Sequence, residues 1–274
     1  MTPYYQDDAV TIYHGDTLEV LADLGELSVD AVLTDPPYAS GSRTEASKVS
    51  SGAMLRSNTE RGKRTRFGER PIDLDQMTTV GFVWLMRAVA LDCYEMLPDG
   101  GSFVSFIDWR QWPNLVGAVE TCNYRVQGMV VWDKCAIGMG NGFRAQHELA
   151  LHASKGVPNV YDKGTPNVLT HPVDAALEAV VFDRVLKHSK VPPINHPSPK
   201  PERIMADLLL VTAPMGGLVL DPFMGSGSTL RAAKDWGYRA IGIESKEAYC
   251  EIAAERCGGP VRDVDGGFDF GGAA

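Results

Sequence analysis

Short apolar runs alternate with stretches of helical spacing along most of the chain. The runs end at Gly, Pro or acidic residues, which is typical of buried strands followed by turns. The predicted strands are residues 10–14, 29–34, 102–107, 126–132, 148–153, 217–221 and 238–244. Strands that alternate with helices predict an α/β fold, with a mostly parallel sheet covered by helices on both faces.

The stretches between these runs predict helices over residues 17–24, 75–97, 202–213, 226–236 and 246–256. Residues 75–97 are apolar nearly all round, which predicts a buried helix. Pro201 stands where the start of a helix accepts proline, and Ser245 is a candidate N-cap for the last helix. Residues 155–195 are interrupted by glycine and proline, so no element is predicted there.

The composition is that of an ordinary globular protein, with 44% hydrophobic and 22% charged residues in a chain of 274. The most apolar stretch, residues 80–91, is too short to span a bilayer, and the N-terminus lacks the features of a signal peptide. We therefore expect a soluble, cytoplasmic protein. The five cysteines form no C-x-x-C pair, and His147 and His152 would face opposite sides of a strand, so no metal site is expected.

Charge is distributed unevenly along the chain. The formal net charge is −9, but residues 39–70 hold eight lysines and arginines against three acidic residues. A basic segment on an acidic body can bind the phosphates of a nucleic acid. We expect loop 39–75 to be such an arm, and a solvated insertion is the alternative. Its candidate contacts are Arg43, Arg61, Lys63, Arg64 and Arg66.

The sequence DPFMGSGST, residues 221–229, joins a predicted strand to a predicted helix. Gly225 and Gly227 permit a tight turn and a close ligand approach, and helix N–H groups point into such turns. The loop lacks the Gly-Lys-Ser/Thr of a P-loop and the third glycine of the dinucleotide fingerprint. Glu244 ends the next strand, where a carboxylate can bind ribose hydroxyls. S-adenosylmethionine fits these features; a plain glycine turn with a surface glutamate is the alternative.

The sequence DPPY, residues 35–38, follows the second predicted strand. Ligands bind at the carboxyl edge of a parallel sheet, and the two prolines end the strand and stiffen the backbone. Asp35 and the carbonyl of Pro36 offer two acceptors beside the ring of Tyr38. Two acceptors beside a stacking ring match the exocyclic amino group of a nucleobase. A Pro-Pro turn with an exposed tyrosine is the alternative.

Together, the two motifs resemble those of the amino-group DNA methyltransferases, which modify adenine N6 or cytosine N4. Over residues 10–154 and 195–257 the chain is similar to the β group of this family, in which the catalytic motif precedes the cofactor loop. The matching residues are Asp35, Pro36, Pro37 and Tyr38 for catalysis, and Asp16, Asp221, Pro222, Phe223, Gly225, Ser226, Gly227 and Ser228 for the cofactor.

The resemblance extends to two further segments. Residues 130–155, VVWDKCAIGMGNGFRAQHELALHASK, are similar to the stretch that precedes the family's recognition region. The family commonly has H-P-T/S-Q-K-P before the helix that flanks the cofactor, and residues 196–201 read HPSPKP, without the glutamine. Lys200 is the remaining candidate for the methionine end of the cofactor, and a solvated lysine at the start of the helix is the alternative.

The resemblance implies a Rossmann-like methyltransferase fold that is circularly permuted. Residues 1–154 and 195–260 would form the catalytic domain, and the tail 261–274 is expected to be disordered. Residues 155–194 would form an inserted target-recognition region, whose candidate DNA contacts are Arg184 and Lys187.

The implied function is methyl transfer from S-adenosylmethionine to adenine N6 in double-stranded DNA. Adenine is preferred because the family's adenine enzymes more usually begin the tetrapeptide with Asp, as this chain does. The alternatives are an N4-cytosine enzyme, a protein glutamine methyltransferase and a non-catalytic DNA-binding subunit. A second copy of the chain and a cognate restriction enzyme are further partners that the resemblance implies.

Overall fold

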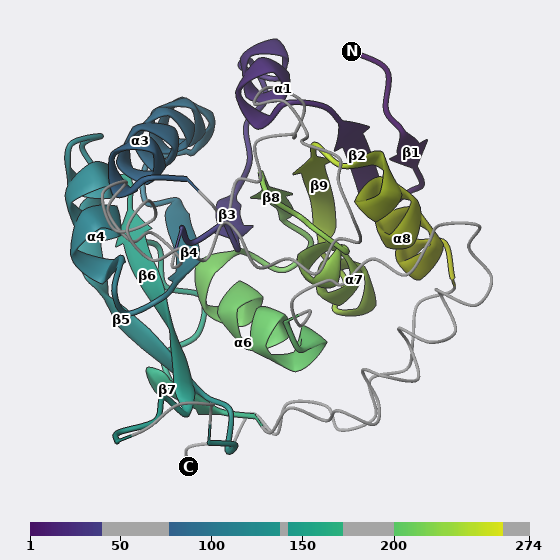
Figure 1. Ribbon diagram of the computed structural model, residues 1–274. Coiled ribbons are helices and arrows are strands. Elements are labelled where there is room, and N and C mark those ends of the chain that lie inside the picture. Colours follow the sequence, from purple (N-terminus) through teal and green to yellow (C-terminus); the bar gives the residue numbers. More distant parts are fainter. Residues whose placement is uncertain (40–76, 138–141, 172–199, 260–274) are drawn as a thin grey trace, which may run out of the picture.

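The computed structural model describes residues 1–39, 77–137, 142–171 and 200–259. The described residues form one sheet in the order β1-β2-β9-β8-β3-β4-β6-β5-β7, with helices on both faces (Figure 1). The strands are β1 Tyr5–Gln6, β2 Val10–His14, β3 Ala31–Thr34, β4 Ser102–Ile107, β5 Arg125–Asp133, β6 His147–Ser154, β7 Val168–Thr170, β8 Leu218–Asp221 and β9 Arg239–Glu244. The helices are α1 Thr17–Asp23, α3 Thr79–Met96, α4 Trp112–Glu120, α6 Glu202–Thr212, α7 Ser228–Asp235 and α8 Glu247–Cys257.

The centre of the sheet is parallel, as the alternation of strands and helices predicts. Strands β2, β9, β8, β3 and β4 pair in parallel, while β6 is antiparallel to both β4 and β5. The predicted α/β fold with a mostly parallel sheet is therefore confirmed. Strand β8, late in the sequence, pairs directly with the early strand β3, and this pairing places the end of DPPY's strand beside the cofactor loop.

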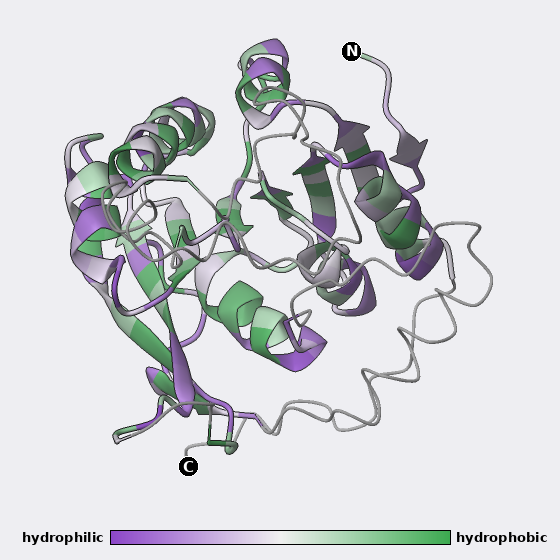
Figure 2. Cartoon of the chain, in the orientation of Figure 1, coloured by the Kyte–Doolittle hydropathy of each residue, from purple (hydrophilic) through white to green (hydrophobic). Residues whose placement is uncertain are grey.

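Two hydrophobic layers cover the sheet, one on each face. Helices α1, α3 and α4 pack on one face, and α6, α7 and α8 contribute to the layer on the other. Within β3, Val32 belongs to the first layer whereas Leu33 belongs to the second, so the strand is buried on both sides. The central strands β8 and β9 are correspondingly hydrophobic in Figure 2. This double burial is why the strands appear in the sequence as continuous apolar runs.

Two sequence predictions are wrong in detail. Helix α3 is not buried all round, because Val80 and Trp84 are 79% and 64% exposed on its outer face. An outer layer one helix thick presents one side to solvent whatever its hydropathy. Ser245 is not the N-cap of α8, since Lys246 occupies that position and the Ser245 hydroxyl donates to Glu244 instead. Among the described residues, no helix has the length and apolar character needed to cross a bilayer.

Several predictions concern parts of the chain outside the described residues. Most of the basic loop 39–75 and the tail 261–274 fall there. The predicted recognition region is described only up to residue 171, where β7 adds to the sheet beside β5. The candidate DNA contacts outside the described residues are Arg43, Arg61, Lys63, Arg64, Arg66, Arg184 and Lys187.

Candidate active site

The sequence motifs meet at one edge of the sheet. Four neighbouring parallel strands, β2, β9, β8 and β3, end at this edge. Glu244 and Asp221 are the last residues of β9 and β8, while Asp16 and Asp35 follow the ends of β2 and β3. The strand that precedes DPPY is also bonded to the cofactor loop, because the hydroxyl of Thr34 donates to Asp221 Oδ1 at 2.8 Å.

The carboxylate of Asp35 in the DPPY segment accepts hydrogen bonds from two sides. The Tyr38 hydroxyl donates to Asp35 Oδ1, and Lys200 Nζ donates to Asp35 Oδ2 at 2.6 Å. Burial and the nearby Asp35 carboxylate raise the pKa of Tyr38 well above its ordinary value, so the phenol stays a hydrogen-bond donor. Pro36 is buried, and its ring removes a backbone donor at the end of the strand. The segment therefore presents acceptors in a fixed place beside an aromatic ring.

Lys200 belongs to a chain of alternating charges that the sequence motifs did not reveal. Its ammonium lies 3.2 Å from Glu148 Oε2, and Lys134 Nζ lies 3.2 Å from Glu148 Oε1. Burial lowers the pKa of Lys200, but Asp35 and Glu148 outweigh burial, so the net shift is upward and the lysine stays charged. Residues 130–155, similar to the family's sequence, contain Lys134 and Glu148, but no single residue there was assigned a role.

The cofactor loop turns on two glycines with left-handed backbone. Gly225 has φ of 50° and Gly227 has φ of 81°. A Cβ on Gly227 would lie 2.9 Å from Cβ of Ala253 in α8, so this glycine permits close packing of the loop against a helix. From the sequence, these glycines were interpreted as allowing a tight turn and the close approach of a ligand. The structure adds a packing reason for Gly227, while Gly225 has positive φ at the start of the turn.

Gly227→Ala should destabilise the fold by roughly 2 to 4 kcal/mol, because it combines left-handed strain with overpacking against Ala253. Thermal unfolding followed by circular dichroism measures the loss. Gly216→Ala is the matched control, since Gly216 has φ of 77° but no atom within 4 Å of its added Cβ. The control should show the strain alone, about 1 to 2 kcal/mol. Equal losses of stability in the two variants would mean that the contact between Gly227 and α8 does not add to the destabilisation.

Asp221 is a buried carboxyl group that links the two motifs. It is 2% exposed and accepts hydrogen bonds from Thr34 Oγ1 and, at 3.1 Å, from the N–H of Phe223. Burial raises the pKa of Asp221 to about 7, although its hydrogen-bond donors act in the opposite direction. The unfolded chain releases this proton near its ordinary pKa of 3.8. Stability that this group contributes is thus present at acid pH and is lost as the pH rises to about 7.

Asp221→Asn should therefore raise the melting temperature relative to wild type, and the gain should be larger at about pH 8 than at about pH 5. The amide keeps one oxygen to accept from Thr34 and Phe223 but cannot ionise. Asp221→Ala is the control, because it removes the acceptor and should be destabilised at both pH values. A melting-temperature difference between Asp221→Asn and wild type that does not change with pH would contradict the raised pKa of Asp221.

Asp16 and Glu244 stand at the ends of neighbouring strands and each also supports a helix start. Asp16 caps α1, because its side chain accepts from the N–H groups of Leu18 and Glu19. Glu244 accepts from the N–H of Lys246 at 2.8 Å, and burial raises its pKa. Thr17 fastens the start of α1 to the cofactor loop through a 3.0 Å bond to the carbonyl of Pro222. Two carboxylates beside a left-handed glycine turn suit a cationic ligand with a ribose.

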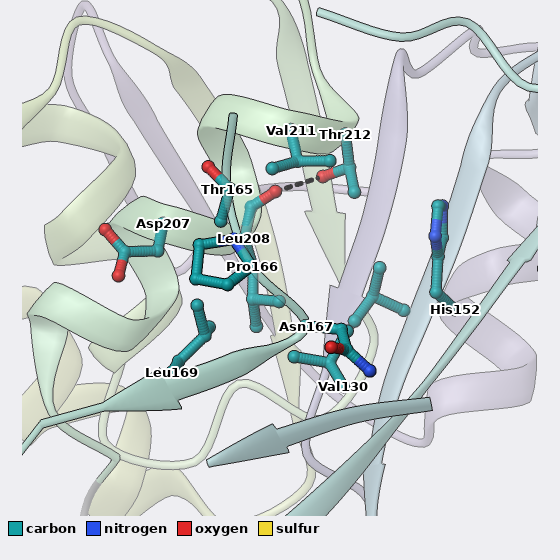
Figure 3. Close-up of a pocket in the computed structure, with 11 residues that line it drawn as sticks. Val130, His152, Thr165, Pro166, Asn167, Leu169, Asp207, Leu208, Val211 and Thr212 are labelled. Atoms are coloured by element: carbon teal, nitrogen blue, oxygen red, sulfur yellow. Dashed lines mark hydrogen bonds between the residues drawn. The ribbon is translucent and has the colours of Figure 1, made fainter. Parts of the chain in front are cut away.

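A separate cavity of about 170 Å³ lies between α6 and the strands β4 to β7 (Figure 3). It shares no residue with DPPY or with the cofactor loop. Burial lowers the pKa of His152 in its wall, so that imidazole is neutral. A mostly apolar wall of this kind does not suit a charged cofactor. Its lining is Val104, Val130, His152, Thr165, Pro166, Asn167, Leu169, Asp207, Leu208, Val211 and Thr212.

Comparison with known proteins finds a family model and several relatives among the DNA methylases. The family model of the N6/N4 DNA methylases matches residues 29–255. The chain is 28% identical over 253 residues to YubD of Escherichia coli (strain K12), and the match covers 92% of each protein. It is 25% identical over 274 residues to the DNA adenine methyltransferase YhdJ of the same organism, covering 92% of this chain and 84% of the relative.

Among solved structures, the PvuII DNA methyltransferase, described as cytosine-N4-specific, shares the fold. Its TM-score is 0.67, at 17% identity, over 93% of this chain and 88% of that one. At this identity the likeness concerns the fold. It supports the α/β arrangement of strands and helices described above.

Proposed function

Because the chain belongs to the N6/N4 DNA methylase family, we propose that its target is the N6 amino group of adenine in double-stranded DNA. Membership makes the chain an S-adenosylmethionine-dependent DNA amino-methyltransferase; the choice of base is the proposal. The observation that supports it is the position of Asp35, a hydrogen-bond acceptor that Tyr38 and Lys200 hold at the carboxyl edge of the sheet, called the rim below. Aspartate in this position is more usual among the family's adenine enzymes, and the relative YhdJ is an adenine enzyme by name.

The residues at the rim would act on a flipped base by positioning it. A target amino group is inaccessible inside a duplex, so the base must leave the stack. Tyr38 would stack on it, an interaction worth about 1 to 3 kcal/mol. Asp35 and the carbonyl of Pro36 would accept its two N–H bonds and direct the nitrogen lone pair outward. S-adenosylmethionine, when bound, supplies the methyl group on a sulfonium, so the chain needs no covalent nucleophile.

The residues fit this cofactor. The loop 221–228 turns at Gly225 and Gly227 into the start of α7, and Glu244 stands on the adjacent strand. We propose that Asp16, Glu244 and Asp221 bind the cofactor, with the backbone of the loop. Asp221 reaches both motifs because it also bonds Thr34, next to Asp35 in the sequence. A substitution in the cofactor loop would thus also affect the site that binds the target base.

Cytosine N4 is the second candidate, because the cytosine-specific PvuII enzyme has the same fold. The test is methyl transfer from isotope-labelled S-adenosylmethionine to unmethylated DNA, followed by digestion to nucleosides. Label in N6-methyl-2′-deoxyadenosine is expected; label in N4-methyl-2′-deoxycytidine would overturn the choice of base. No label in DNA, but label in added protein, would favour a glutamine methyltransferase. No transfer at all would favour a non-catalytic DNA-binding subunit, which the intact Asp35 and Tyr38 argue against.

The partners are also proposals. We propose that double-stranded DNA is bound through loop 39–75 and residues 155–194, and that the enzyme acts in the cytoplasm. Phosphate contacts would make binding fall steeply with salt concentration. A homodimer and a cognate restriction enzyme are the further partners expected from the family resemblance. Light scattering of the purified chain at several concentrations would test the dimer.

A further inference from the structure

We propose that Lys200 is a positioning residue that fixes the catalytic carboxylate of Asp35, and that Glu148 in turn holds Lys200 in place. This inference rests on the proposed function of the DPPY segment. It assigns Lys200 a role different from the contact with the methionine end of the cofactor that the sequence implied. Lys200 stands just before α6, 165 residues from Asp35 in the sequence, and meets it at the rim.

The geometry favours Asp35 as the main partner of Lys200. The Lys200 ammonium is 2.6 Å from Asp35 Oδ2, within hydrogen-bonding distance, but 3.2 Å from Glu148 Oε2. Glu148 Oε2 is buried and makes no well-aligned hydrogen bond among the described residues. Its contact with Lys200 is therefore electrostatic. Glu148 is itself balanced by Lys134, so the charges alternate from Asp35 to Lys134 and sum to zero.

The surroundings explain why this lysine can be rigid. Lys200 is 8% exposed, and its ammonium lies 5.1 Å from the ring of Phe106 and 5.4 Å from the ring of Tyr38. A buried ammonium without partners would be very costly, so the two carboxylates are required for it to remain here. The aromatic faces add cation–π attraction. Lys200 is thereby confined between Asp35, Glu148 and the two rings.

Fixing Asp35 has a direct consequence for the reaction. Each carboxylate oxygen can accept two hydrogen bonds. Tyr38 uses one position on Oδ1 and Lys200 uses one on Oδ2, so the carboxylate cannot rotate, yet it keeps acceptor capacity for a substrate amino group. Without Lys200, the carboxylate would be held only through Tyr38 and would lie near the buried Glu148. Misplacement by about 1 Å can cost about a hundredfold in rate.

The test is the nearly isosteric, uncharged variant Lys200→Met. Its single-turnover rate of methyl transfer to DNA, at saturating cofactor, should fall about a hundredfold. Its dissociation constant for S-adenosylmethionine, measured by calorimetry, should match that of wild type. Addition of a primary alkylammonium ion to a Lys200→Ala variant should restore part of the rate, because the cation can re-enter the space beside Asp35. A residue that only stabilised the fold would not give this rescue.

The chain contains a closely matched control. Lys234 Nζ lies 2.6 Å from Asp7 Oδ2, and the Tyr5 hydroxyl donates to the same carboxylate, at the opposite edge of the sheet. Lys234 is 12% exposed against 8% for Lys200. Lys234→Met therefore deletes an ion pair of the same length and similar burial, and it should lower the melting temperature without changing the rate.

Three results would overturn the inference. One is a Lys200→Met enzyme with weakened cofactor binding and a normal rate at saturation, which would make Lys200 a cofactor ligand. Another is an unchanged rate and cofactor affinity. If Lys200→Met fails to fold, Glu148→Gln takes its place, and a normal rate in that variant would be the third. Absence of methyl transfer in the wild-type chain would instead contradict the proposed function, so the two failures are distinguishable.

Discussion

Asp35→Ala should reduce methyl transfer to DNA at least about a thousandfold while leaving binding of S-adenosylmethionine unchanged. The magnitude is that of removing a group that acts mainly on the transition state. Asp35 is the acceptor that both Tyr38 and Lys200 hold at the rim, and its side chain is 31% exposed, so a substrate can reach it. The cofactor loop follows a different strand and keeps its own contacts. Single-turnover kinetics and calorimetry with the same preparation would measure both quantities.

Two controls make this result interpretable. Asp7→Ala removes a carboxylate that is likewise held by a tyrosine hydroxyl and a lysine, but at the far edge of the sheet, and it should retain the wild-type rate. Asp35→Asn keeps one acceptor oxygen and nearly the same volume, so loss of activity in it would show that the charge is needed. More than a tenth of wild-type activity in Asp35→Ala would contradict the proposed role.

The sequence predicted the central strands of the sheet with little error because strands such as β3 and β4 are buried on both faces and appear as continuous apolar runs. Strand β2 and the predicted strand 10–14 have the same bounds, and β3 begins two residues inside its prediction. The short edge strands β1 and β7 were missed, since two or three residues paired at a sheet edge have no periodic pattern of their own. The circular permutation of the sheet was implied by the family resemblance, not by hydropathy.

The site was predictable where a local motif marks it and not where distant charges meet. DPPY and the glycine loop are contiguous, so their residue types and spacing were visible. Glu148 lies in β6 and Lys134 directly follows β5, 113 and 99 residues from Asp35 in the sequence. A chain of alternating charges assembled from such distant positions has no signature in the linear sequence. For the same reason, Lys200 was assigned from its neighbours in sequence, whereas its partner was set by tertiary packing.

Arg231→Met should destabilise the protein by about 3 to 5 kcal/mol, the cost of leaving one member of a buried ion pair without its partner. Arg231 is 1% exposed. Its guanidinium pairs with Asp235 one turn later, with Nε 2.8 Å from Oδ2, and Nη1 donates to the carbonyls of Arg256 and Gly259. One side chain thus joins α7, which begins at the cofactor loop, to the end of α8. Chemical denaturation followed by fluorescence would measure the loss.

The double variant Arg231→Met, Asp235→Leu separates charge from packing. Because a buried ion pair replaced by apolar groups is often neutral in stability, the double variant should recover a large part of what Arg231→Met loses. Arg110→Met is the surface control, since Arg110 pairs with Asp108 at 3.0 Å with 56% of its side chain exposed, and it should cost less than about 1 kcal/mol. A loss in Arg231→Met no larger than in Arg110→Met would mean that α7 is held by its apolar contacts alone. The cofactor loop would then depend on Gly227 and Ala253, and not on the buried charges behind them.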